Sequence, residues 1–284
     1  MARGNNYPWW RQAAEALEDR FYAGGWAARI AYAVGLQGQL AVDRRDLRLP
    51  FRSELPEPLR VAFASDIHAG PLTDPRLIDV LFRTIAHFDP HVVLFGGDFV
   101  SLDHRYVDDL AEQLDRLRAP AGMFGVLGNH DLWLGHERIG ARLQEKGVRI
   151  LVNEAAALPP PYDEIWICGL DDPGSGQPDP AVTFRDAGRR RILLMHSPMG
   201  LPLVQDYPFD LALCGHTHGG QIAFPWGRPI ILPRHSGERR YSNGRFDLPE
   251  GGVLVASRGV GMSDLPIRWS APSEVHLYTL RACD

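Results

Sequence analysis

The sequence predicts an α/β fold with a short helical extension at its amino-terminal end. From residue 60 onward, apolar runs of strand length alternate with amphipathic helical stretches, which is typical of a sheet covered by helices. The second half of the chain is richer in strand-like runs. A second sheet packed against the first would accommodate them, so we expect an α/β sandwich.

The first half of the main domain alternates predicted strands with predicted helices. Asp74 and Pro75 are typical of a helix start, because aspartate caps free N–H groups and proline has no N–H to leave unpaired. Asp89-Pro90 marks the end of that helix. We expect strands over 59–64, 91–95 and 122–127, and helices over 75–88, 103–118 and 136–146.

The second half is predicted to consist mainly of strands and loops. Residues 171–180 are rich in Pro, Gly and Asp, which favours a loop. Residues 225–250 are dense in Pro, Gly and Arg and predict a long loop or a ragged hairpin. The strands are expected over 148–152, 164–168, 191–195, 209–214, 220–224, 252–256 and 274–280.

Residues 1–50 are predicted to form a helical appendage to a main domain over residues 51–284. Prolines at 50, 56 and 58 mark the boundary between them. Two interpretations of the appendage remain open. Its helices pack on the main domain or on a second subunit, or they lie in the plane of a membrane with aromatic and arginine anchors. The apolar stripe of the first helix comprises Trp10, Ala14, Leu17 and Phe21, with Arg11, Glu15, Glu18 and Asp19 on the other face.

Composition excludes several classes of protein. The chain has 284 residues and a net charge of -5, which argues against a nucleic-acid binder that relies on basic charge. Its cysteines are Cys168, Cys214 and Cys283, an odd number that makes a disulfide framework improbable and suits a reducing compartment. No apolar run reaches the length of a membrane-spanning helix. We therefore expect a cytoplasmic protein.

Residues that can bind metals follow five of the apolar segments directly. In open α/β sheets, sites form outside the carboxyl ends of the strands, so these residues should gather along one edge. The run Gly215-His216-Thr217-His218 stands out, because alternate residues of an extended chain point the same way and would present both imidazoles to one place. The candidates are Asp66, His68, Asp98, Asn129, His130, His196, His216 and His218.

The types of these residues favour a site for two metal ions. Carboxylate, amide and imidazole ligands without thiolate indicate manganese, with iron or zinc as alternatives. Asp98 follows two glycines and is positioned to bridge the ions. Two divalent cations beside Asp66 and Asp98 would leave the site positive, which favours a phosphate substrate. A water bridging the ions would lose a proton readily and become the nucleophile.

Five motifs together resemble those of the calcineurin-like metallophosphoesterases, in the order of that family. They are Asp66-x-His68, Gly97-Asp98, Gly128-Asn129-His130-Asp131, His196 and Gly215-His216-Thr217-His218, and the resemblance spans residues 60–280. It implies a four-layer α/β/β/α sandwich. It further implies one metal held by Asp66, His68, Asp98 and His218, and another held by Asp98, Asn129, His196 and His216.

The same resemblance assigns two residues that are not ligands. His130 matches a histidine that faces the phosphate and assists the leaving group. Asp131 either orients His130 or only caps the helix that follows.

The run Gly215 to Ile222 resembles a bacterial branch of this family whose members often carry an amino-terminal membrane segment. Some of those relatives cleave the pyrophosphate of UDP-2,3-diacylglucosamine, and others are assigned as broad phosphodiesterases. The resemblance therefore implies a phosphate-ester substrate, small or lipid-linked. Peripheral contact with the inner membrane is the alternative to a purely cytoplasmic location, and the sequence does not indicate an oligomeric state.

Substrate choice is less well determined by the sequence. Arg258 and Arg268 either bind a second phosphate or pair with acids, and Trp133 either meets an apolar leaving group or packs. The rim candidates are Arg234, His235, Arg239, Arg240 and Tyr241. We expect a hydrolase of phosphodiesters or pyrophosphates. The alternatives are a broad phosphomonoesterase, a catalytically silent metal-binding scaffold, and a two-metal hydrolase of a non-phosphate bond.

Overall fold

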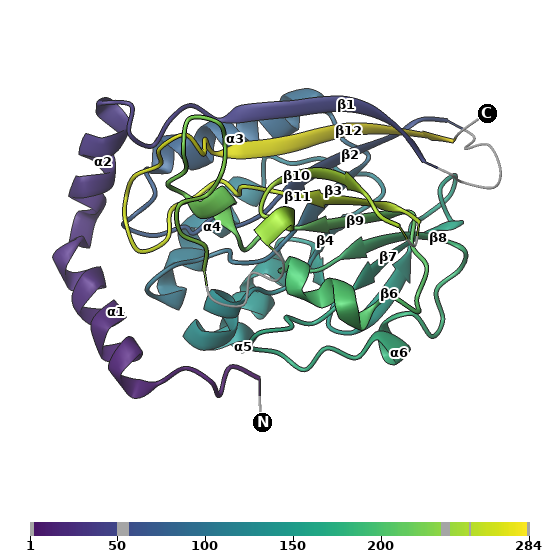
Figure 1. Cartoon of the computed structure of the whole chain (residues 1–284), viewed down its shortest axis with the longest axis horizontal. Coiled ribbons are helices and arrows are strands. Elements are labelled where there is room, and N and C mark those ends of the chain that lie inside the picture. Colours follow the sequence, from purple (N-terminus) through teal and green to yellow (C-terminus); the bar gives the residue numbers. More distant parts are fainter. Residues whose placement is uncertain (1–2, 50–56, 234–238, 250, 283–284) are drawn as a thin grey trace.

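Two six-stranded sheets lie face to face in the computed structural model, which describes residues 3–49, 57–233, 239–249 and 251–282 (Figure 1). In the first sheet the strand order is β1-β12-β2-β3-β4-β5. Strands β2 to β5 run parallel, whereas β12 is antiparallel to β2 and parallel to β1. The bounds are β1 Ala41–Leu49, β2 Leu59–Ala64, β3 Val92–Phe95, β4 Met123–Gly125, β5 Val148–Ile150 and β12 Glu274–Ala282.

The second sheet has the order β10-β11-β9-β8-β7-β6. Strands β7, β8, β9 and β11 are parallel, and the two edge strands β6 and β10 are antiparallel to their neighbours. The bounds are β6 Glu154–Ala157, β7 Ile165–Gly169, β8 Arg190–Leu194, β9 Leu211–Cys214, β10 Gly244–Asp247 and β11 Val253–Ala256.

Buried apolar side chains fill three spaces and define the layers. Helices α3 Pro75–Phe88, α4 Val107–Leu114 and α5 Asn129–Glu145 cover the outer face of the first sheet. Between the sheets lie side chains such as Phe63, Leu94, Ile167 and Leu213. The outer face of the second sheet is covered by shorter elements, including α6 Pro180–Thr183 and the 3-10 helix η3 Pro198–Leu203. The chain is therefore an α/β sandwich with helical outer layers.

The helix starts follow the expected chemistry. The side chain of Asp74 accepts a hydrogen bond from the Arg76 N–H at 2.9 Å, and Pro75 occupies the first turn of α3. The stretch expected over 103–118 divides into the 3-10 turn η2 His104–Tyr106 and α4. The helix expected over 136–146 begins earlier, at Asn129, and is interrupted at Gly135, whose φ is 118°. That earlier start places Asn129 and His130 on the first turn of α5.

The structure differs from the expected set of strands at two places in the second half of the chain. Residues 220–224 form no strand; the 3-10 turn η4 His218–Gly220 precedes them, and Ile222 makes only an isolated bridge to Trp269. The edge strand β6 is absent from the expected set, because Glu154-Ala-Ala-Ala lacks the β-branched and aromatic residues that predict strands. The loop or hairpin expected over 225–250 contains η5 Arg239–Tyr241 and β10.

The amino-terminal region is helical only in its first part. Helix α1 spans Trp9–Phe21, and the 3-10 turn η1 Ala23–Gly25 connects it to α2 Trp26–Ala33. The later part of the expected appendage is strand β1, which pairs with β12 along nine residue pairs and belongs to the first sheet. The charged run Asp43 to Arg48 obscured this strand, because it lies at a sheet edge where alternate side chains reach water. The expected boundary at Pro50 and Pro56 lies outside the described residues.

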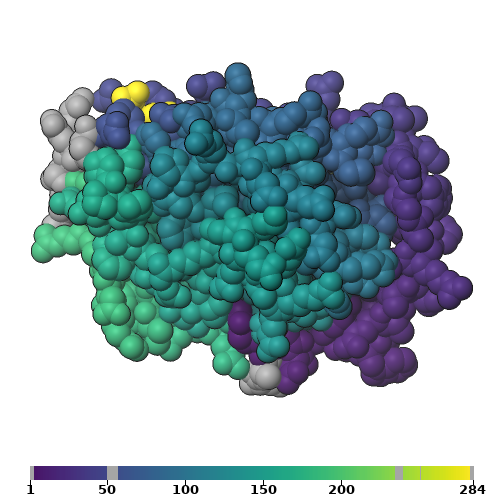
Figure 2. Space-filling view, turned by 180° about the vertical axis from the view of Figure 1, so that it is seen from behind, coloured from purple at the N-terminus to yellow at the C-terminus, as the bar shows by residue number. Residues whose placement is uncertain are grey.

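The packing of α1 also differs from expectation. Its buried residue is Glu15, whereas Trp10, Leu17 and Phe21 are exposed. The two helices form one edge of the molecule (Figures 1 and 2). In the part of the chain that the structure describes, no helix is both long and apolar enough to cross a membrane. Cys168 and Cys214 are buried free thiols, and Cys283 lies outside the described residues.

Candidate metal centre

The predicted ligands all lie where strands end. Asp66 and His68 follow β2, and Asp98 follows β3. Asn129 begins α5 shortly after β4. His196 follows β8, and the pair His216 and His218 follows β9. Because these strands are parallel within each sheet, their carboxyl ends bring the ligands to one edge of the sandwich, as the strand-end rule predicts.

The backbone at these positions is unusual. Five of the candidate ligands have a positive φ: Asp66, His68, Asp98, His216 and His218, at 51°, 45°, 51°, 69° and 52°. Non-glycine residues rarely adopt this left-handed region, and each instance costs about 1–3 kcal/mol. Such strain persists where the surrounding structure enforces it, and it concentrates at functional sites. The expectation that His216 and His218 converge through an extended backbone is therefore wrong, because both are left-handed.

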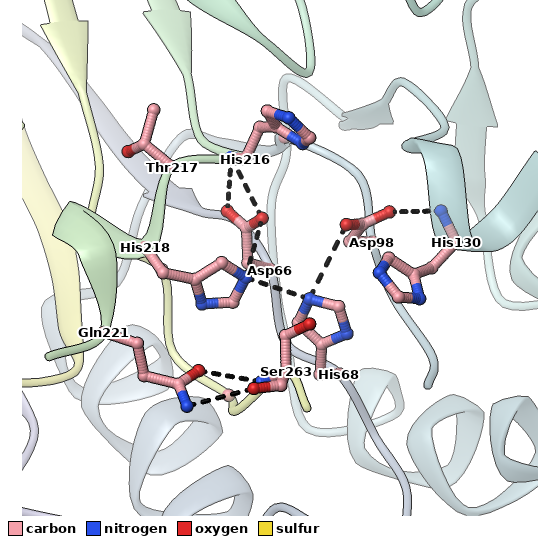
Figure 3. A network of polar contacts seen from close by, with 12 residues as sticks. Asp66, His68, Asp98, His130, His216, Thr217, His218, Gln221 and Ser263 are labelled. Atoms are coloured by element: carbon pink, nitrogen blue, oxygen red, sulfur yellow. Dashed lines mark hydrogen bonds and ion pairs between the residues drawn. The ribbon is translucent and has the colours of Figure 1, made fainter. Parts of the chain in front are cut away.

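One group of side chains comprises Asp66, His68 and His218 (Figure 3). The Nε2 atoms of His68 and His218 lie 3.1 Å apart, and His218 Nε2 lies 3.6 Å from Asp66 Oδ1. The N–H of His216 donates to both oxygens of Asp66 at 2.9 and 3.1 Å, which fixes the carboxylate. A Cβ on Gly215 would overlap that carboxylate, so only glycine fits there.

A second group comprises Asp98, His196 and His216, with Asn129 beside it. His196 Nε2 lies 3.1 Å from Asn129 Oδ1, 3.2 Å from His216 Nδ1 and 3.3 Å from Asp98 Oδ2. His196 Nδ1 donates to the carbonyl oxygen of Gly96 at 2.8 Å. That bond fixes a proton on Nδ1, so Nε2 is the nitrogen that faces the candidate metal centre.

Asp98 lies between the two groups. Its Oδ2 is 3.3 Å from His196 Nε2 and 3.6 Å from His68 Nε2, so a single oxygen is within reach of both sets. Its Oδ1 accepts the His130 N–H at 2.8 Å (Figure 3). A Cβ on Gly128 would overlap the Asp98 side chain, so this approach requires glycine.

The protonation states of most of these buried groups favour cation binding. His196 is the exception: burial alone would lower its pKa, but the Asp98 carboxylate raises it well above the usual value, so a metal must displace a proton there. Burial lowers the pKa of His68 to about 3, so its imidazole is neutral and has a free lone pair. Burial alone would raise the pKa of Asp98, but the neighbouring His196 and His130 hold it well below its usual range. Burial raises the pKa of Asp66 to about 6. A cation would stabilise the charged carboxylates that burial disfavours.

The donor set fits two divalent ions. Oxygen and nitrogen lone pairs face one another here, for example at His68 and His218, with few N–H donors to separate them. Because Asp98 and His68 are buried, water cannot fully compensate these lone pairs, and a bound cation would do so. Ligand atoms bound at about 2.1 Å to one ion stand roughly 3.0–3.4 Å apart, close to the spacings within each group. Imidazole, carboxylate and amide ligands without a cysteine suit manganese, iron or zinc.

His130 lies at the same edge without a polar partner for its inner nitrogen. Its ring is 4.9 Å from the ring of His68, and among the described residues its buried Nδ1 makes no hydrogen bond. Asp131 does not bond to this ring. Its carboxylate accepts the N–H groups of Gly128 and Phe99 at 3.0 and 2.9 Å. Asp131 therefore caps α5 and ties the loop after β3 to it, which is the capping alternative left open by the sequence.

Trp133 packs against His130 and belongs to a larger aromatic cluster. The two rings lie 5.2 Å apart, and Trp133 also stacks on Tyr7 at 5.2 Å. The Trp133 indole N–H donates to Asn6 Oδ1 at 2.9 Å. Tyr7 and Trp133 also line a cavity of about 440 Å³ between α1 and the main domain. Trp133 thus separates the amino-terminal segment from His130. No pattern in the sequence indicated that these two parts of the chain lie so close together.

The two arginines considered for phosphate binding have structural contacts instead. Arg258 pairs with Glu274. Arg268 is buried and donates to backbone carbonyls, including Gly261 and Ala271, while its Nη2 lies 3.1 Å from His218 Nδ1. Arg268 also donates to the His218 carbonyl oxygen at 3.3 Å, so it holds the backbone of a candidate ligand, a role that its position far along the sequence did not reveal.

Several polar residues lie in the loops that surround the candidate metal centre. The Gln221 side chain is hydrogen-bonded to the backbone of Ser263 and Leu265, so it fixes the loop beside His218 (Figure 3). Of the rim candidates, Tyr241 is buried, Arg239 and Arg240 are exposed, and Arg234 and His235 lie outside the described residues.

An α/β sandwich whose strand ends carry imidazole, carboxylate and amide ligands defines a metal-dependent hydrolase of phosphoric esters. The chain belongs to the calcineurin-like phosphoesterase family, whose model matches residues 59–220. This match covers β2 to η4 and includes every predicted ligand. Divalent metal ions are accordingly its cofactors.

Three of the curated relatives match at least three quarters of this chain. The sequence is 31% identical over 220 residues to the phosphodiesterase YaeI of Escherichia coli, covering 75% of this chain and 79% of the relative. It is 32% identical over 228 residues to the uncharacterized metallophosphoesterase YkuE of Bacillus subtilis, covering 77% of each. It is 27% identical over 294 residues to the UDP-2,3-diacylglucosamine pyrophosphatase LpxG of Chlamydia trachomatis, covering 84% of this chain and 88% of the relative.

Proposed function

We propose that this enzyme hydrolyses a phosphodiester or pyrophosphate bond at a site for two divalent metal ions. Asp66, His68, Asp98 and His218 would hold one ion, and Asp98, Asn129, His196 and His216 the other. The observation that carries the proposal is the position of Asp98 Oδ2, which lies 3.3 Å from His196 Nε2 and 3.6 Å from His68 Nε2. A carboxylate oxygen shared between two ligand sets is typical of sites that bridge two ions.

The ions would polarise the phosphoryl group and activate a water molecule for in-line attack. The chain's own residues do the remaining work. The pair of N–H bonds from His216 holds Asp66 in place, and the Gly96 carbonyl holds the His196 ring. His130 would donate a proton to the leaving oxygen or stabilise its charge, because it lies at the site edge and its ring is not committed to a protein acceptor.

The substrate class follows from the charge of the site and from the relatives. Two divalent cations beside two carboxylates leave net positive charge in a buried site, which attracts phosphate oxygens. The relatives named as a phosphodiesterase and as a UDP-2,3-diacylglucosamine pyrophosphatase support a diester or a pyrophosphate over a monoester. We propose a lipid-linked or nucleotide-linked substrate, manganese as the metal, and a cytoplasmic location.

A substrate panel tests the proposal. The metal-free enzyme is reconstituted with manganese, iron or zinc and assayed on a phosphomonoester, a phosphodiester and a nucleotide-linked lipid pyrophosphate. We expect the diester or the pyrophosphate to be hydrolysed fastest, with manganese. A faster rate on the monoester would favour a broad phosphomonoesterase, and no hydrolysis of any substrate would favour a silent metal-binding scaffold.

A further inference from the structure

Helix α1 makes its buried contacts through polar side chains, whereas α2 buries Ala28 and Ala31. Glu15 is buried and accepts hydrogen bonds from Tyr7 and Arg11. Asp19 accepts a hydrogen bond from the Tyr106 hydroxyl at 2.6 Å and pairs with Arg105. An amphipathic helix ordinarily buries its apolar stripe and exposes its charges. On α1 this arrangement is reversed.

The opposite face of α1 and α2 presents large apolar side chains to the exterior. Their exposed fractions lie between 46% and 69%, and they recur at helical spacing on both helices. Contiguous apolar surface of this kind marks a contact with a membrane or with another protein. We call this the outer apolar face; it comprises Trp10, Leu17, Phe21, Trp26, Ile30 and Val34.

Two loops next to the candidate metal centre continue this exposed surface. The Arg268 N–H donates to the Leu36 carbonyl, which joins the loop around residues 263–270 to the end of α2. That loop exposes Trp269, whose carbonyl accepts the N–H of Ala223. The adjoining loop exposes Trp226 and Ile231 at 73% each.

The helices also lie over the edge that carries the ligands. The helices contact Arg76, Arg105 and Trp133, and Gln37 just beyond α2 contacts Leu72; all four partners belong to segments that follow β2, β3 and β4. The outer apolar face is therefore on the side of the molecule at which the candidate metal centre forms.

The charges of this region match an anionic lipid surface. Helices α1 and α2 hold three arginines and three acids, so the match depends on which of these charges stay exposed. Two of the three acids of α1 are paired, Glu15 with Arg11 and Asp19 with Arg105, whereas Arg20 and Arg29 are exposed. Tryptophan and arginine beside aliphatic residues are typical of helices that lie in a membrane interface.

We propose that the outer apolar face docks the enzyme on a bilayer containing anionic lipid, with α1 and α2 lying in the plane of the interface. The loops of Trp226 and Trp269 contact the same surface. Docking would bring the candidate metal centre to phosphate groups that lipids present at the interface. This last step rests on the proposed function, whereas binding to the bilayer does not.

Vesicle flotation of the full chain tests the docking. Vesicles of phosphatidylcholine with phosphatidylglycerol should carry the wild-type protein, and vesicles of phosphatidylcholine alone should carry less. The double variant Leu17→Gln and Phe21→Gln should bind at least about tenfold more weakly, because two apolar anchors are lost. Arg20→Gln should bind about fivefold more weakly, and the difference should shrink at high salt.

Val182→Gln with Leu203→Gln is the matched control, since both residues are exposed and apolar but lie over the second sheet. It should float like the wild type. Absence of wild-type flotation, or equal flotation of the Leu17 and Phe21 variant, overturns the proposal. The proposal is also overturned if the wild type is a dimer, the Leu17 and Phe21 variant is a monomer, and vesicle binding is the same for both. In that case the outer apolar face joins two copies of the chain. Hydrolysis of a soluble diester, measured on every variant, should be unaltered and separates failed docking from failed catalysis.

Discussion

The carboxylate of Asp98 accepts the backbone N–H of His130 through Oδ1, at 2.8 Å, and directs Oδ2 toward His196 and His68. One side chain thus connects the start of α5 to both groups of candidate ligands. The hydrogen bond fixes the carboxylate, and the same bond places His130 beside the ions that Asp98 would bridge.

Replacing the bridge should remove both ions. In Asp98→Asn, the shared oxygen loses its charge, so we expect both metals to be lost and activity to fall to that of the metal-free enzyme, while the fold remains. Elemental analysis and circular dichroism measure these two results. Asp108→Asn, an exposed acid on α4 paired with Arg138 and Arg142, is the control and should keep its metals. Two fully occupied ions in Asp98→Asn would refute the bridging role.

His130→Ala should keep both ions and lose rate. A residue that acts as a general acid contributes roughly 10²–10⁴-fold. The loss should be large for a substrate with an alkoxide leaving group and smaller for a nitrophenolate, which needs no proton. Steady-state rates on the two diesters measure the difference. Equal losses for both would eliminate proton donation and leave only charge stabilisation.

Arg268 should affect one ion more than the other. Its guanidinium donates to the His218 carbonyl oxygen at 3.3 Å and to neighbouring carbonyls, so Arg268→Met should loosen the ligand group of Asp66, His68 and His218. Side chains that orient ligands typically account for 10–100-fold in metal affinity, and we expect a loss of about that size for a single ion. Calorimetric titration of metal into the metal-free protein resolves the two affinities.

The control is Arg191→Met, because Arg191 likewise donates to backbone carbonyls but lies on β8 near Gly188 and Pro208. It should alter stability without selective loss of one ion. Arg268→Lys, which keeps the charge, should recover part of the affinity. Equal weakening of both ions in Arg268→Met would contradict the assignment of His218 to one group.

Stability should depend on pH through His276. Burial alone would lower its pKa, but the hydrogen bond to Asp43 at 3.2 Å and the ion pair with Glu274 at 3.3 Å raise it above the usual value. The protonated ring therefore stabilises the fold fully below the unfolded pKa of about 6.5, and this contribution is lost as pH rises through the folded pKa. His276→Gln should lower the free energy of unfolding by about 2 kcal/mol near pH 6 and by progressively less at higher pH.

Urea unfolding across this pH range measures the difference. His87→Gln, on the exposed side of α3, should change stability little at any pH. Glu274 contributes at the acidic end: its pKa is lowered to about 2, so its stabilisation is present above about pH 4.5 and is lost as pH falls through 2. A His276→Gln difference that stays constant with pH would contradict the ion pair.

The sandwich could be predicted from the sequence because its buried strands appear as apolar runs. The candidate ligands could be predicted because they directly follow these runs. Strand β2 matches its expected bounds, and its end places Asp66 at the edge that the fold class implies. The strand-end rule needs only chain order, so residues distant in sequence, such as His68 and His196, could be assigned to one edge.

The remaining features depend on contacts that no local pattern encodes. The charged strand β1 is defined by its pairing with β12, which lies more than two hundred residues later. The orientation of α1 depends on Asp19, which accepts a hydrogen bond from Tyr106 and pairs with Arg105. The sequence therefore shows the helical periodicity but not which face of the helix is buried. Arg268 and Trp133 likewise acquire their roles only through the packing of distant segments.

A metal titration of activity tests the two-ion hydrolase most directly. Metal-free enzyme is titrated with manganese while hydrolysis of a phosphodiester and bound metal are measured together. We predict that activity appears as the second equivalent binds, that it reaches its maximum at two ions per chain, and that chelation abolishes it. Full activity with a single ion, or activity that survives complete metal removal, would contradict the account.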